Sequence, residues 1–101
     1  MDERQTERWT EILDSHGANS HVIFKCIDKM TKGNAKYGEW SAANKDENRN
    51  FYLELEEELL DGLNYLLMAL DLEKYNDRVL HSLIGRVVEL LSYLGTFGET
   101  R

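Results

Sequence analysis

Four acidic side chains and one amide lie close together in the middle of this 101-residue sequence. Their positions are Glu54, Glu57, Glu58, Asp61 and Asn64. At about 100° per residue, a helix would place Glu54, Glu58 and Asp61 along one side, with Glu57 beside them. Mg²⁺ binds a few carboxylate oxygens and completes its shell with water and substrate phosphates. A divalent-cation site is therefore one interpretation of this acid stripe.

Two other interpretations use the same residues. As a solvated helix face, N-terminal acids would favour the helix dipole and need no function. As a general acid/base pair, they would need a raised pKa in a dry pocket, which nothing in the sequence indicates. The stripe continues into Tyr65, Met68 and Ala69, which are apolar. A stripe of this kind is expected to be covered, and covered carboxylates need basic partners or a metal ion.

The helix that must position the stripe is predicted over residues 50–71, the longest strongly periodic run in the chain. Its other side is apolar and is expected to face a core. The residues on that side are Tyr52, Leu55, Leu59, Leu63, Leu66, Leu67 and Leu70.

Composition predicts an all-α fold. The chain has no proline, and helix-favouring residues fill its periodic segments. We expect one domain over residues 1–101, built as a small bundle of three to four helices. The apolar surface is wide for a small monomer, so a second copy is expected to complete the bundle in a homo-oligomer, a dimer or a tetramer.

The net charge of the chain limits the kinds of partner that it can bind. The net charge of −7 argues against a nucleic-acid backbone as the main partner. Residues 51–101 carry ten acids and four bases, whereas residues 25–45 carry five lysines and two acids. This layout suits a metal-plus-phosphate site. It also suits an intramolecular ion-pair surface, which is the simpler explanation.

Three further helices are predicted around the central one. The first, over 2–14, docks through Trp9 and stops at Gly17. The second, over 20–32, is capped by Asn19 or Ser20, and the last, over 77–94, by Asn76 or Asp77. Apolar positions at helical spacing define their inner faces: Val22, Ile23, Cys26, Ile27 and Met30 on the second helix, and Val79, Leu80, Leu83, Ile84, Val87, Leu90, Leu91 and Leu94 on the last.

A loop of about 17 residues, 33–49, is predicted between the second and third helices. It contains Tyr37 and Trp40, and large rings in a loop normally pack on something. With Lys32 and Lys36 they could form a flap that stacks on a base and contacts phosphates. Alternatively, the loop lies over the core and buries both rings.

Cys26 is the only cysteine, so no disulfide framework is expected, and its apolar stripe predicts a buried thiol. Nothing resembles a secretion signal or a membrane span. The chain is expected to be cytoplasmic, without a membrane partner.

Two segments carry a family resemblance: Lys32-Gly33-x-x-Lys36-Tyr37-Gly38-x-Trp40, and Glu54-x-x-Glu57-Glu58-Leu59-x-Asp61-x-x-Asn64-Tyr65-Leu66. Together they resemble the MazG-like nucleoside triphosphate pyrophosphohydrolases, especially short phage and bacterial members. The resemblance implies an all-α, oligomeric, Mg²⁺-dependent enzyme that releases pyrophosphate and a monophosphate from a (deoxy)nucleoside triphosphate.

The resemblance also implies roles for particular residues. Glu58 and Asp61 match the ExxD pair and would be catalytic. The metal ligands would be Glu54, Glu57, Glu58 and Asp61, and the residues near the substrate would be Lys32, Lys36, Tyr37, Trp40 and Asn64.

The match covers roughly residues 32–67, and the family normally carries its acidic motifs on two helices. A second register takes Glu57-Glu58-x-x-Asp61 as the first motif and Glu89-x-x-Ser92 as the second, without the final carboxylate. The alternative to an enzyme is a non-catalytic helical module for interaction or oligomerisation, which could be a degenerate member of the same fold.

Overall fold

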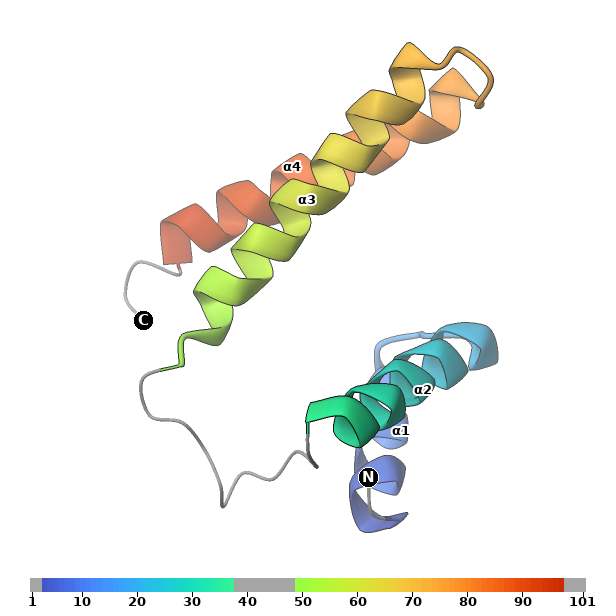
Figure 1. Cartoon of the computed structure of the whole chain (residues 1–101), viewed down its shortest axis with the longest axis vertical. Helices are drawn as coiled ribbons and strands as arrows, with labels where there is room; N and C mark the ends of the chain where they lie inside the picture. Colours follow the sequence, from blue (N-terminus) through green and yellow to red (C-terminus); the bar gives the residue numbers. More distant parts are fainter. Residues whose placement is uncertain (1–2, 38–48, 98–101) are drawn as a thin grey trace. The chain divides into compact units, whose positions relative to one another are not determined.

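The computed structural model describes residues 3–37 and 49–97, whose backbone forms four α-helices and no strand (Figure 1). This confirms the all-α prediction. The chain divides into two units, Met1–Glu47 and Asn48–Arg101, which are described separately. The helices are α1 (Glu3–Ser15) and α2 (Ser20–Tyr37) in the first unit, and α3 (Phe51–Asp71) and α4 (Asp77–Phe97) in the second.

Asparagine side chains cap three of the helices. Asn19 Oδ1 accepts the Val22 amide at 2.9 Å, and Asn76 Oδ1 accepts the Val79 amide at 3.2 Å. Both caps were among the residues predicted from the sequence. At α3, Asn50 Oδ1 accepts two amides, those of Tyr52 and Leu53, at 3.0 and 3.2 Å. Each cap satisfies amides that have no partner within the first helical turn.

Gly17 ends α1 as predicted. Its φ of 83° lies in the left-handed region, where glycine pays no steric penalty. Its amide donates to the Asp14 carbonyl at 2.9 Å, and the Ala18 amide donates to the Leu13 carbonyl at 3.1 Å. These two bonds form a Schellman motif, which satisfies the last carbonyls of the helix.

The predicted ends of two helices were wrong. Helix α2 continues through Gly33 to Tyr37, five residues beyond its predicted end, so the start of the predicted loop is helical. Helix α4 continues through Gly95 to Phe97. Glycine inside a helix costs only about 1 kcal/mol relative to alanine, and it ends a helix reliably only where φ is positive. Neither Gly33 nor Gly95 has a positive φ.

Helices α3 and α4 run antiparallel, side by side, and form a hairpin (Figure 1). The α4 residues Leu80 and Leu94 are 7% and 9% exposed, and they are the buried apolar side chains among the described residues. Half-buried side chains continue the same seam at spacings of three and four, as in an antiparallel coiled coil. These are Leu59, Leu63, Leu66 and Leu70 on α3, and Ile84, Val87 and Leu91 on α4.

Apolar side chains also cover much of the hairpin outside this seam. Tyr52, Leu55 and Leu67 on α3, predicted to face the core, are 53%, 47% and 45% exposed. On α4, Val79, Leu83 and Leu90 are 53%, 43% and 53% exposed. Two helices offer each other only one narrow seam, so the α3–α4 hairpin by itself does not bury an apolar surface of this width.

Replacing Asn50 by alanine should lower the free energy of unfolding of the α3–α4 hairpin by about 1 kcal/mol, because two amides lose their acceptor. Urea denaturation followed by circular dichroism would measure the change. Asn50→Asp, which keeps an acceptor oxygen, should leave the stability within a few tenths of a kcal/mol of the original. An equal loss in both variants would contradict a capping role.

Candidate functional site

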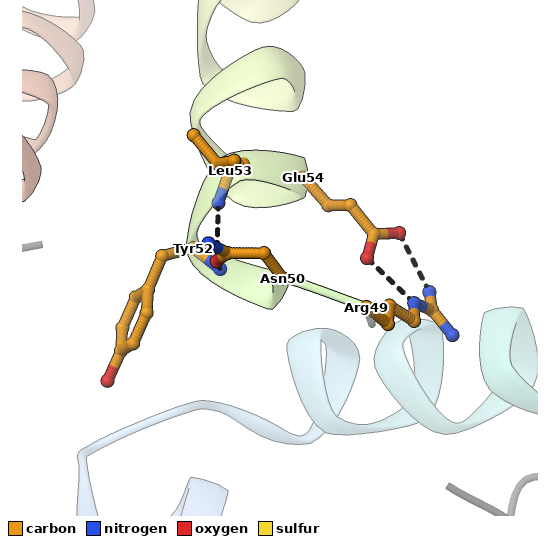
Figure 2. Close-up of polar contacts among 5 residues, drawn as sticks. All are labelled: Arg49, Asn50, Tyr52, Leu53 and Glu54. Atoms are coloured by element: carbon orange, nitrogen blue, oxygen red, sulfur yellow. Dashed lines mark hydrogen bonds and ion pairs between the residues drawn. The ribbon is translucent and has the colours of Figure 1, made fainter. Parts of the chain in front are cut away.

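Arg49, which lies just before α3, binds Glu54 in the first turn of that helix (Figure 2). Its Nε and Nη2 atoms donate to the two carboxylate oxygens at 2.7 and 2.9 Å, in a bidentate ion pair. The same guanidinium lies 4.4 Å from the ring centroid of Phe51. This contact was not predicted from the sequence, although an arginine just before the cap and a glutamate in the first turn permit it. Because the pair occupies both Glu54 oxygens, a metal ion at Glu54 would have to displace Arg49.

The other acids of the stripe face solvent. Glu57, Glu58, Asp61 and the amide Asn64 are exposed in the chain. They lie on adjacent turns of α3, on the side away from the seam with α4. Within the described residues, no group of three or more acidic, histidine or cysteine side chains is close enough to hold a metal ion. A metal on this stripe would therefore need ligands from a substrate, water or a second chain.

The predicted substrate-binding residues of the first unit lie on one helix. Lys32 Nζ pairs with the Asp28 carboxylate at 2.9 Å, one turn earlier on α2. The hydrogen bond that Lys32 donates to Asp28, together with the negative charge of that carboxylate, raises the pKa of Lys32 above its usual 10.5. Lys32 is therefore a cation at neutral pH. The backbone of Lys36 and Tyr37 is helical rather than part of a loop, and Trp40 lies outside the described residues.

Cys26 does not have the predicted buried thiol. The residue is exposed, and it lies at the edge of an apolar hollow of about 210 Å³ that is otherwise lined by the α1 residues Trp9, Ile12 and Leu13. Helix α1 packs against the centre line of the apolar face of α2, where Ile23, Ile27 and Met30 are half-buried. Val22 and Cys26, at the edge of that face, are exposed. The predicted docking of α1 through Trp9 fits this arrangement.

The second register of the acidic motif is not assembled within the chain. Glu89 is exposed, and by helical spacing it lies on the side of α4 opposite the seam with α3. The Ser92 hydroxyl donates to the Val88 carbonyl at 2.9 Å, a bond within its own helix. Glu89 and the α3 acids therefore lie on different sides of the hairpin.

These features define an all-α protein whose α3–α4 hairpin presents a solvent-facing acid stripe beside wide apolar surfaces. No protein-family model matches the chain, and no curated protein or solved structure gives a significant match. Across residues 3–37 and 49–97, none of the helices has the length and apolarity that crossing a bilayer requires.

Proposed function

We propose that this protein is a Mg²⁺-dependent, MazG-like hydrolase that converts a (deoxy)nucleoside triphosphate and water into a monophosphate and pyrophosphate. The observation that carries the proposal is the arrangement of Glu57, Glu58 and Asp61 on adjacent exposed turns of α3. The resemblance of residues 32–67 to this enzyme family supports the same reading. Intact nucleotides are intracellular metabolites, so the proposal places the protein in the cytoplasm.

The residue types of the stripe fit a magnesium ion, because carboxylates are hard oxygen ligands. Glu58 and Asp61 would hold the ion together with water and substrate phosphates. Glu57 would have to reorient to join them, and Glu54 would have to release Arg49. The bound ion would neutralise phosphate charge and lower the pKa of an attacking water. Glu58 and Asp61 would orient that water toward the α-phosphorus.

The remaining residues would bind the nucleotide. Asn64, one turn beyond Asp61, can donate a hydrogen bond to the sugar or a phosphate. The family resemblance alone assigns substrate binding to Lys32, Lys36, Tyr37 and Trp40 of the first unit. The described residues hold no complete metal cluster, so the remaining ligands would come from water, the phosphates of the nucleotide, or a second copy in a dimer or tetramer.

A panel of nucleoside and deoxynucleoside triphosphates, incubated with the full chain and Mg²⁺, tests the proposal. Ion chromatography should detect pyrophosphate and a monophosphate in equal amounts from at least one nucleotide, and chelation of the metal by EDTA should stop their release. Orthophosphate and a diphosphate as products would contradict the proposed bond cleavage. No product from any nucleotide, with the protein folded and oligomeric, would contradict hydrolysis altogether.

A second candidate function is a non-catalytic self-association module. The exposed apolar side chains of α3 and α4 favour it, because a soluble monomer rarely shows wide apolar patches. Under this reading, the acid stripe is a solvated face that keeps the assembled protein soluble. The nucleotide panel separates the two candidates, since only the hydrolase produces pyrophosphate.

A further inference from the structure

The α3–α4 hairpin has two apolar faces, one on each side of its seam. By helical spacing, the first contains Leu55, Gly62 and Ala69 of α3 with Val79, Leu83 and Leu90 of α4, and we name it the Leu83 face. The second contains Leu53, Leu60 and Leu67 of α3 with Val88 of α4, and we name it the Leu60 face. The leucine and valine side chains of both faces are between 43% and 53% exposed.

Charge distinguishes the two faces. Glu56, Asp71 and Asp77 border the Leu60 face, with His81 as its nearest basic group. Two copies meeting through that face would bring these like charges together, which is unfavourable. The Leu83 face is bordered by one acid, Glu58, and one base, Arg86, so it carries no net charge. Self-association is therefore favoured through the Leu83 face.

Shape points the same way. On the Leu83 face, α3 presents the small residues Gly62 and Ala69, whereas α4 presents the large residues Leu83 and Leu90. Because the turn between the helices spans residues 72–76, Leu83 lies level with the stretch between Gly62 and Ala69. Apart from its own helix and chain neighbours, a Cβ atom at Gly62 would have no atom within 4 Å. One helix thus offers a groove, and the other a ridge at the same height.

We propose that two copies of this chain form a four-helix bundle through the Leu83 face. A two-fold axis parallel to the helices lays the α4 ridge of each copy on the α3 groove of the other and makes every neighbouring pair antiparallel. The same operation brings Glu58 beside Arg86 of the second copy at the rim. The apolar contacts of this face need neither a metal ion nor a nucleotide, so the dimer does not depend on the proposed hydrolysis.

The size of the face suits a stable dimer. A 21-residue helix is about 31 Å long, and two helices side by side are about 20 Å wide, so the face covers ~600 Å² in projection. Accessible area exceeds projected area on a surface of side chains, and a specific interface buries about 800 Å² per partner. The face is therefore of the order that a specific dimer requires.

Sedimentation equilibrium of the full chain tests this dimer. The original protein should sediment at twice its chain mass of 11.8 kDa. Gly62→Trp fills the groove and should raise the dimer dissociation constant about 100-fold, with the helical circular dichroism retained. Gly85→Trp, placed where the chain also leaves open space, and Leu60→Lys, on the other face, should both remain dimers.

A charge reversal tests the same interface without altering its packing. Arg86→Glu should weaken the dimer about tenfold, and adding Glu58→Arg should restore it, because the opposite charges meet again. A monomeric original protein, or a Gly62→Trp variant that still dimerises, would overturn the proposal. So would loss of the dimer in Leu60→Lys alone. Pyrophosphate release is not read in these experiments, so their outcome is separate from that of the nucleotide panel.

Discussion

Leu80→Ala should lower the free energy of unfolding of the α3–α4 hairpin by about 2–4 kcal/mol. The Leu80 side chain is only 7% exposed, and truncating it leaves a cavity at the seam in addition to the lost burial. The hairpin has few other buried side chains, so the loss is a large fraction of its stability. Urea denaturation at one fixed protein concentration would measure it, since oligomer stability depends on concentration.

Leu53→Ala is the matched control for this prediction. It removes the same atoms from α3, but Leu53 is 47% exposed and lies outside the proposed dimer interface. We expect Leu53→Ala to lower the free energy of unfolding by less than about 1 kcal/mol. Similar losses for the two variants would mean that the α3–α4 seam is not the core of this unit.

Glu58→Gln and Asp61→Asn should each lower the rate of pyrophosphate release at least about 100-fold, if the proposed hydrolysis is correct. Each change keeps the size of the side chain and removes the negative charge that would hold the metal. Both residues are exposed, so the fold should be unaffected, and the melting temperature should stay within a few degrees. Initial rates at saturating nucleotide and Mg²⁺ provide the measurement.

Asp71→Asn is the control for the acid stripe. Asp71 is exposed near the end of the same helix but lies off the stripe. Its replacement also removes a negative charge, so it corrects for the general effect of charge on nucleotide binding. Equal rate losses in all three variants would indicate a non-specific electrostatic effect and argue against a metal site at Glu58 and Asp61.

Much of the fold could be predicted from the sequence because the determining signals are local. The caps at Asn19 and Asn76 and the stop at Gly17 depend on residues within one turn of the helix end. The α3–α4 seam follows from apolar spacing, which four leucines on α3 and five aliphatic residues on α4 continue over several turns. In contrast, Gly33 and Gly95 were misread because a glycine is only a weak helix breaker when φ stays negative.

Burial was harder to predict than helix position. Spacing identifies which side of a helix is apolar, but it does not say whether the same chain has enough neighbouring surface to cover that side. Leu55 and Cys26 both lie on the apolar sides of their helices, and both are exposed. Each lies at the edge of its apolar side, where the neighbouring helix does not cover it. For the same reason, the acid stripe could be located on α3, but the prediction that it is covered was wrong for Glu57, Glu58 and Asp61, which are exposed in the described chain.

The site itself was predictable only in part. The acids of α3 could be placed on shared turns from their spacing, whereas the bidentate contact between Arg49 and Glu54 depends on the path of the chain before the helix. That contact divides the stripe into one paired acid and a group exposed to solvent. Glu57, Glu58 and Asp61 are therefore the exposed acids of the stripe that a metal ion could reach.

Binding of Mn²⁺, as a paramagnetic substitute for Mg²⁺, tests the proposed function most directly. Electron paramagnetic resonance of the full chain, with a non-hydrolysable triphosphate present, measures the free ion. We predict that the protein binds Mn²⁺ more tightly than the nucleotide alone does, and that the double variant Glu58→Gln/Asp61→Asn loses this gain. Equal Mn²⁺ binding by the original protein and the double variant would contradict a metal site on the acid stripe.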